Sequence, residues 1–181
     1  MQQNLDQKNT DIASKRKLFI KNLINKYACN KAIDIPAENK TAKAFAPSNI
    51  ALVKYWGKKD LALNQPTNDS LSISLDNLGA ITSITLKENK QNQTSKLCHD
   101  KIYLNNDLVD KESRFFTRLT KFLDLFRPNS NYYFIVKTSL NIPMGCGVAS
   151  SACGFAALTL ALDKLFAWNL PKEKLSQIAQ I

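Results

Sequence analysis

The sequence predicts an α+β domain in which a sheet is flanked by helices, preceded by an extra amphipathic helix. Three observations support this prediction. Strand-like runs recur between positions 42 and 139. A helix with one apolar face interrupts them at 110–126. An apolar helical stretch follows a loop rich in glycine and serine at 141–151. The length of 181 residues suits one domain with an appendage.

The N-terminal segment is predicted to contain a basic helix over 10–28. Residues 1 to about 10 are polar and are predicted to be disordered, and Thr10 or Asp11 can cap the helix. Apolar residues repeat at helical spacing: Ile20, Leu23, Ile24 and Tyr27. Packing against the main body is the expected role, while a membrane-surface or partner-binding role stays open. Residues 34–41 resemble a linker, so 1–40 is interpreted as an extension and 41–181 as the domain.

Most of the predicted strands lie before the helix at 110–126, and one further strand follows it. A strand-like portion lies within 42–56, with Pro47 marking a bend. Strands are predicted at 70–75 and 81–87 with a turn at 77–79, then at 97–104, at Leu108 after a turn at 105–107, and at 132–139.

Three helices complete the predicted domain. The helix at 110–126 presents one apolar face, made of Phe115, Leu119, Phe122, Leu123 and Phe126. A second helix is predicted at 150–166, and a third begins at Lys172, just after Pro171. This last pattern stays in register up to Ile181 without a stop signal, so we expect the polypeptide to continue in its complete form.

The composition favours a ligand that is a small anion. The net charge is +10, which suits either nucleic acid or an anionic small molecule. No RNA-binding aromatic motif or helix-turn-helix signature is present, so we expect no nucleic-acid partner. No apolar run is long enough to span a membrane, and there is no signal-peptide pattern. The four cysteines have no zinc spacing, which indicates reduced thiols in a cytoplasmic protein.

The loop from Asn141 to Phe155 has the composition of a phosphate-binding loop. Its glycines allow close approach of the backbone to an anion, and the following helix offers unpaired N–H groups. Ser150 and Ser151 add hydroxyls that can reach a phosphate oxygen or a metal ion. The spacing matches neither the Walker A nor the dinucleotide pattern. From the residues alone, an ordinary loop with a serine-rich helix start remains an alternative.

A second unusual segment spans 49–60 and contains Lys-Tyr-Trp-Gly-Lys-Lys. It predicts cations and hydroxyl or indole donors at one end of a sheet, which suits a polyanionic ligand. The alternative places the lysines in solvent and Tyr55 and Trp56 in the core. For Lys59 the solvated interpretation is adopted.

Together these segments resemble the mevalonate diphosphate decarboxylase family of the GHMP kinase superfamily. The matching pieces are 46–60, 66–75 and 141–158, in the order of the family, and the resemblance covers about 43–181. The Lys-Tyr-Trp-Gly-Lys block is the more specific piece. The resemblance implies a GHMP-kinase N-terminal domain of the ribosomal protein S5 domain 2-like fold. The extension to about residue 40 is longer than the family pattern predicts.

The resemblance also implies an activity, which is ATP-dependent decarboxylation of mevalonate 5-diphosphate to isopentenyl diphosphate with ATP and Mg²⁺. By similarity, Lys54, Asn49 and Ser151 are expected to be catalytic, and Ser151 also to assist phosphate and magnesium placement. The expected contacts to the diphosphate substrate are Tyr55, Trp56, Lys58 and Ser70. The expected ATP-binding residues are Pro143, Gly145, Cys146, Gly147, Val148, Ala149, Ser150 and Ser151.

Other interpretations of the same resemblance stay open. An arginine and an aspartate essential to the family are expected beyond Ile181, so the 181-residue chain alone is expected to be inactive. One alternative is a related GHMP enzyme that phosphorylates or decarboxylates mevalonate or its phosphates. Another is a non-catalytic protein that binds a nucleotide, or a partner through its basic helix. Decarboxylases of this type are commonly dimers, so a homodimer is considered.

Overall fold

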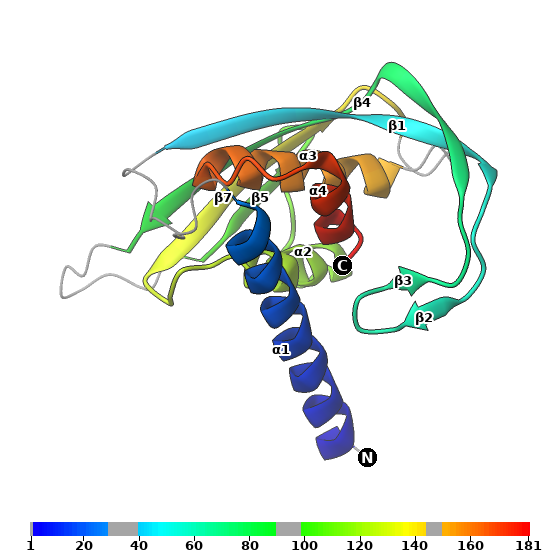
Figure 1. The fold of residues 1–181 in the computed structure, drawn as a ribbon. Helices are drawn as coiled ribbons and strands as arrows, with labels where there is room; N and C mark the ends of the chain where they lie inside the picture. The colour runs from blue at the N-terminus through cyan, green and yellow to red at the C-terminus, as the bar shows by residue number, and fades with distance from the viewer. Residues whose placement is uncertain (1, 29–39, 90–98, 144–149) are drawn as a thin grey trace.

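A five-stranded mixed sheet forms the framework of the domain, with helices packed against it (Figure 1). The computed structural model describes residues 2–28, 40–89, 99–143 and 150–181. The strand order is β1-β4-β7-β5-β6, and within it β5 and β7 are parallel while the other pairs are antiparallel. Strands β2 and β3 form a separate two-stranded sheet. The elements are α1 (Gln2–Tyr27), β1 (Thr41–Val53), β2 (Lys58–Asp60), β3 (Gln65–Pro66), β4 (Leu71–Glu88), β5 (Lys101–Leu104), β6 (Asp107–Leu108), α2 (Arg114–Leu123), β7 (Tyr132–Leu140), α3 (Ser150–Phe166) and α4 (Lys172–Ala179).

The core lies between this sheet and the helices, which confirms the predicted α+β class. Residues alternate between buried and accessible along the long strands, as expected for strands with one covered face. The buried positions on the sheet are Ala42, Ala44, Ala46, Ser48, Gly79, Ala80, Thr82, Ile84, Leu86, Ile102, Phe134 and Val136. Helix α3 packs on β1 and β4, and its apolar residues are buried over most of its length. The described residues contain no helix long and apolar enough to cross a membrane.

The predicted turn at 77–79 is wrong, because β4 runs through these residues as one long strand. It pairs with β1 along most of its length. The register shifts between Pro47 and Asn49, where the bend was predicted, and again between Ala51 and Val53. A Cβ placed on Gly79 would lie 2.7 Å from the Cα of Pro47 and would overlap the carbonyl oxygen of Ala46. This glycine therefore permits close approach of two strands, and it does not mark a turn.

The predicted disorder of residues 1–10 is also wrong, since α1 begins at Gln2. Residues 2–27 contain neither proline nor glycine, so no local signal ends the helix before Tyr27. Thr10 and Asp11 lie within the helix and do not cap it. The C-terminal half packs on the domain as predicted, with Ile20, Leu23 and Ile24 buried and Tyr27 partly buried.

The remaining boundaries differ from the predictions by a few residues. Helix α2 begins at Arg114, four residues later than predicted, because the Ser113 hydroxyl caps it by accepting a hydrogen bond from the Phe116 N–H (3.1 Å). Phe115 is 40% exposed and does not share the buried face. The turn before β6 is confirmed, with positive φ at Asn105 and Asn106. The predictions for 34–39 and 97–98, and for Cys29, Cys98 and Cys146, lie outside the described residues.

Candidate functional site

The strand that leads into the glycine-serine loop is fixed at its end by two asparagines. The Asn141 side chain accepts a hydrogen bond from the Gly79 N–H and donates one to the Asn77 carbonyl, both at 2.7 Å. The Asn105 side chain accepts from the Leu140 N–H at 2.8 Å. These contacts hold the end of β7 against β4 and the β5–β6 turn, so the loop starts from a fixed point.

The far side of this loop is the N-terminus of α3. The helix begins at Ser150, as the sequence predicted, with Ser150 partly buried and Ser151 exposed. Pro143 is exposed and lies three residues after the end of β7. Residues 144–149 lie outside the described residues, so the predictions for Gly145, Cys146, Gly147, Val148 and Ala149 remain predictions. Burial raises the pKa of the Cys153 thiol, which donates a hydrogen bond to the Ser150 carbonyl (3.1 Å). A buried thiol with a raised pKa stays protonated at neutral pH, which disfavours a role as a nucleophile.

An apolar cavity of about 300 Å³ lies beside these serines. It is enclosed by α2, α3 and the strands β5 and β7. Its lining residues are Leu104, Phe115, Leu119, Thr138, Leu140, Ser150, Ser151, Gly154, Phe155 and Leu158. Hydroxyls at one side and apolar walls elsewhere suit a ligand with a flat apolar group attached to a polar chain.

The sequence predicted a strand of the main sheet that carries Lys54, Tyr55 and Trp56, and this prediction is wrong. Strand β1 ends at Val53, the next residues are irregular, and Lys58 belongs to the separate β2–β3 sheet. The alternative that places the aromatic residues in the core is also wrong, because Tyr55 and Trp56 are exposed, the latter by 83%. The reversal needs Gly57, whose φ of 83° is unfavourable for a side chain.

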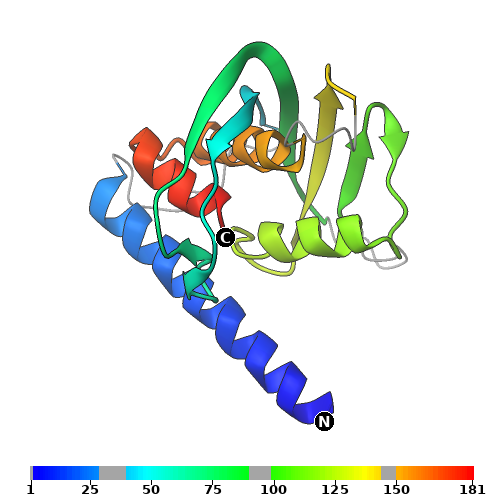
Figure 2. The ribbon, with the colours of Figure 1, turned by 90° about the vertical axis from the view of Figure 1, so that its right-hand side faces the viewer.

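The hairpin formed by β2 and β3 is docked on two helices. Lys15 of α1 forms an ion pair with Asp60 (2.7 Å), and the Nε of Arg16 donates to the Ala62 carbonyl (2.6 Å). Asn64 donates to the main-chain oxygens of Gln180 and Ile181, both at 3.0 Å. The hydrogen bond from Lys15 is the largest cause that lowers the pKa of Asp60, so this contact is ionised at neutral pH. Figure 2 shows the hairpin lying across α1, close to the end of α4.

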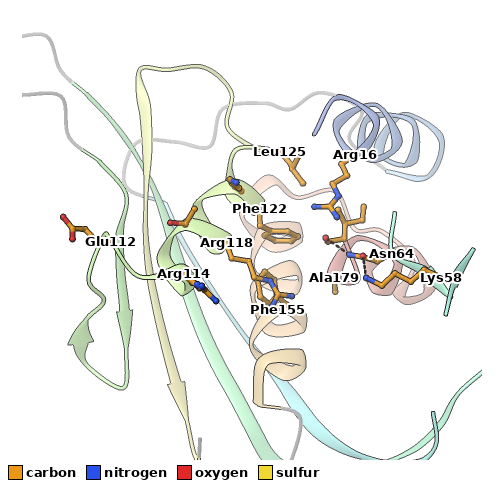
Figure 3. Close-up of a pocket in the computed structure, with 13 residues that line it drawn as sticks. Arg16, Lys58, Asn64, Glu112, Arg114, Arg118, Phe122, Leu125, Phe155 and Ala179 are labelled. Atoms are coloured by element: carbon orange, nitrogen blue, oxygen red, sulfur yellow. Dashed lines mark hydrogen bonds between the residues drawn. The ribbon is translucent and has the colours of Figure 1, made fainter. Parts of the chain in front are cut away.

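A second cavity, of about 510 Å³, lies where this hairpin meets the helices (Figure 3). Five of its lining residues are cationic and one is a carboxylate, Glu112, whose side chain lies at the outer edge in Figure 3. None of the five cations forms an ion pair with a carboxylate in the described part of the chain. The lining residues are Arg16, Lys58, Asn64, Glu112, Arg114, Thr117, Arg118, Lys121, Phe122, Leu125, Phe155, Ala179 and Ile181. We call this space the basic cavity.

Besides Arg16, which is held by the Ala62 carbonyl, two further cations are fixed by neighbouring groups. Lys58 donates a hydrogen bond to the Asn64 side chain at 2.7 Å. The Arg118 guanidinium lies over the ring of Phe155, 4.9 Å from its centre. Phe155 lines both cavities and lies one helical turn beyond Ser151 on α3. The two cavities are therefore neighbours on either side of one aromatic ring.

Lys58 is the only substrate-binding residue predicted from the sequence that lines the basic cavity. Lys54, Tyr55, Trp56, Asn49 and Ser70 line neither cavity. The prediction also missed the basic residues of α2. Their signal was present, because positions 114, 118 and 121 repeat at the spacing of one helix face.

The fold is that of the N-terminal domain of GHMP-type proteins, with the loop at a strand-to-helix junction. The chain belongs to the diphosphomevalonate decarboxylase-like family, since the model described as "Diphosphomevalonate decarboxylase-like N-terminal domain" matches residues 46–181. The segment up to residue 45, which contains α1, lies outside this match.

Individual relatives agree with this assignment. The chain is 38% identical to "Diphosphomevalonate decarboxylase" of Debaryomyces hansenii over 154 residues, covering 78% of this chain and 37% of the relative. It is similar to the crystal structure of mevalonate diphosphate decarboxylase from Staphylococcus aureus, with a TM-score of 0.65, 32% identity, and coverage of 77% of this chain and 41% of that chain. A further structure, "MDDEF in complex with MVAPP, AMPPCP and Magnesium", has a TM-score of 0.59 and 30% identity, with coverage of 77% and 41%. The chain thus spans well under half the length of these proteins.

Proposed function

We propose that this chain supplies the diphosphate-binding and ATP-binding portion of an ATP-dependent diphosphomevalonate decarboxylase. The reaction phosphorylates the tertiary hydroxyl of mevalonate 5-diphosphate. The new phosphate then leaves with loss of carbon dioxide, giving ADP, phosphate, carbon dioxide and isopentenyl diphosphate. As the phosphate leaves, positive charge develops on the tertiary carbon, and the electrons of the broken bond to the carboxylate form the double bond.

The observation that supports this proposal most strongly is the position of Lys58. It belongs to the most specific block of the sequence, and it faces a cavity with four further cations from two helices. A diphosphate ester carries several negative charges in a small volume, and such a group is stabilised where several fixed cations converge. In the proposal, Lys58, Arg114, Arg118 and Lys121 neutralise and orient the 5-diphosphate.

The neighbouring apolar cavity suits the nucleotide. Its walls would contact the base, and the Ser150 and Ser151 hydroxyls with the N-terminus of α3 would bind the phosphates. The similar structure solved with AMPPCP, an analogue of ATP, and magnesium supports this assignment. Among the described residues no group of three His, Cys, Asp or Glu could hold a metal ion. On the resemblance, the Ser151 hydroxyl is proposed as a ligand for Mg²⁺, and the ion would otherwise bind phosphate oxygens and water and neutralise phosphate charge.

Phe155 lines both cavities, so the proposed nucleotide and diphosphate sites are close enough for transfer of a phosphoryl group from ATP to the substrate. A nucleotide whose phosphates lie at Ser151 ends about one helical turn, or ~5 Å, from the basic cavity. The residues of the chain thus act by positioning and by neutralising charge. Lys54 and Asn49 stay proposed as catalytic residues on the resemblance alone.

The first test replaces Lys58 with alanine and measures binding of mevalonate 5-diphosphate by isothermal titration calorimetry. We expect the dissociation constant to rise about tenfold, or ~1.4 kcal/mol, because one fixed cation is lost from the basic cavity. Lys59→Ala is the matched control, since it removes the same charge from the next residue of β2, which lies outside the cavity lining. We expect Lys59→Ala to change the constant by less than twofold.

Equal effects of the two substitutions would contradict the assignment of the basic cavity to the diphosphate. Mevalonate 5-monophosphate is titrated in parallel. If the wild-type chain binds the monophosphate as tightly as the diphosphate, a related GHMP enzyme that acts on the monophosphate is favoured.

The same proposal includes a cytoplasmic location and a homodimer. Four cysteines without C-x-x-C or zinc spacing suit reduced thiols, which supports the location. Light scattering after size-exclusion chromatography tests the dimer, since a mass near twice the calculated 20.3 kDa is expected for this chain.

A further inference from the structure

We propose that Arg16, on helix α1, is a phosphate-binding residue of the basic cavity, so that the N-terminal helix completes the ligand site. The inference deepens the proposed function and rests on it for the identity of the ligand, a diphosphate ester. Arg16 precedes the region that matches the family model, which begins at residue 46. No family pattern therefore assigns this residue a role.

Packing of α1 places Arg16 at the cavity. Ile20, Leu23 and Ile24 are buried in the core, which fixes the helix on the domain. Arg16 lies one turn before Ile20 on the same face and is partly buried among the lining residues. In Figure 3 its side chain extends from α1 toward the space between α2 and α4.

The guanidinium is also oriented before any ligand binds. Its Nε donates to the Ala62 carbonyl at 2.6 Å, and the neighbouring ion pair of Lys15 with Asp60 holds the same hairpin. The two terminal nitrogens have no hydrogen-bond partner among the described residues. A guanidinium fixed through Nε with both terminal nitrogens available is well suited to bind phosphate oxygens.

The charges around Arg16 favour an anion. The pKa of Arg16 is lowered, first by burial and then by the positive charge of Arg118 across the cavity. Lys58 and Lys121 add further positive charge to the same lining, and Glu112 is the single carboxylate side chain among its described residues. Repulsion between cations is relieved when an anion binds between them, and this contribution favours a ligand with several negative charges.

The alternative role for Arg16 is structural, in which its hydrogen bond to Ala62 only holds the β2–β3 hairpin to α1. The substitution Arg16→Gln separates the two roles, because the glutamine amide can still donate to the Ala62 carbonyl but has no charge. Lys15→Gln breaks the other contact between α1 and the hairpin, the ion pair with Asp60, without changing the lining of the cavity. Lys17→Gln removes one charge from an exposed neighbour that also lies outside the lining.

The experiment measures dissociation constants for inorganic pyrophosphate and for mevalonate 5-diphosphate by titration calorimetry, with circular dichroism to verify folding. We expect Arg16→Gln to weaken binding of both ligands about five- to tenfold, and Lys15→Gln and Lys17→Gln to stay within twofold of wild type. Arg16→Lys keeps the charge but loses the planar fork, so its affinity should lie between those of wild type and Arg16→Gln. This variant provides the test if Arg16→Gln does not fold.

The outcomes separate this inference from the proposed function. If Lys58 substitution weakens mevalonate 5-diphosphate binding while Arg16→Gln stays within twofold, the inference is overturned and the function stands. Equal losses of affinity in Lys15→Gln and Arg16→Gln also overturn it, because attachment of the hairpin to α1 then explains the effect. If pyrophosphate binding depends on Arg16 but mevalonate 5-diphosphate does not bind, the inference stands and the proposed substrate is wrong. If neither ligand binds to wild type, both are overturned.

Discussion

Replacing Asp100 with alanine is expected to lower the free energy of unfolding by about 3–5 kcal/mol, the cost of breaking a buried ion pair from one side. The Asp100 carboxylate is 3% exposed and accepts hydrogen bonds from both terminal nitrogens of Arg127, at 3.0 and 2.6 Å. It also accepts one from the Phe134 N–H at 2.8 Å. Alanine would leave the guanidinium with Asp124 as its one remaining carboxylate among the described residues, and this buried N–H without its partner.

The direction of the Arg127 pKa agrees with this expectation. Burial by itself lowers the pKa of Arg127, but hydrogen bonds and charge from Asp100, with a further contribution from Asp124, raise it overall. The folded environment therefore favours the charged guanidinium only while its carboxylates are present.

Asp124→Ala is the matched control for this prediction. Asp124 also pairs with Arg127, at 2.8 Å, but its side chain is 54% exposed. Exposed ion pairs contribute about 0–1 kcal/mol, so urea denaturation should show a small shift of the midpoint for this variant and a large one for Asp100→Ala. A loss below about 1 kcal/mol in Asp100→Ala would contradict the argument.

The ion pair of Asp100 with Arg127 matters for the site because it connects the sheet to the segment after α2. Arg127 follows α2 and donates hydrogen bonds to Asp100, just before β5, and to the Tyr132 carbonyl at the start of β7. Asp100 in turn accepts from the Phe134 N–H in β7. The contact thus fixes the end of the helix that presents Arg114, Arg118 and Lys121 to the basic cavity. Loss of Asp100 is expected to affect ligand binding through the position of α2.

Much of the fold could be predicted because its elements have strong local signals. Helix α3 begins and ends where the apolar pattern predicted, and α4 begins at Lys172 as expected behind Pro171. The start of α2 was missed because Ser113 caps it, and a serine in that pattern does not by itself identify the cap. The helical start of α1 was missed because its first residues are polar, and polarity was interpreted as disorder.

The candidate site was predictable only where it is continuous in sequence. The glycine-serine loop and Lys58 belong to contiguous blocks, and the latter lies in the basic cavity as expected of a ligand-binding residue. The rest of the cavity comes from α1, α2 and the end of α4, which are distant in sequence and meet only through tertiary packing. No single-sequence pattern reports that Arg16 and Arg118 lie across one space.

The second large effect is expected for Gly79→Ala, which should destabilise the fold by about 2–3 kcal/mol. The added methyl group would overlap the Ala46 carbonyl and lie 2.7 Å from the Pro47 Cα, and both are backbone atoms of the paired strand. Flexible side chains could move aside, but a paired strand moves only with loss of its hydrogen bonds. The denaturation midpoint in urea measures this cost.

Gly154→Ala provides the contrast, because the same methyl group on α3 meets nothing within 4 Å. Alanine is favoured over glycine inside a helix by about 0.8–1.0 kcal/mol, so this variant should be at least as stable as wild type. Gly79 is further constrained because its N–H donates to the Asn141 side chain at 2.7 Å and its carbonyl accepts from the Asn141 N–H at 3.2 Å. A methyl group that displaces Gly79 would thus also release the start of the glycine-serine loop, so Gly79→Ala should weaken nucleotide binding as well as stability. A Gly79→Ala protein as stable as wild type would show that β1 and β4 can separate at this point, and the fixed loop start would then need another cause.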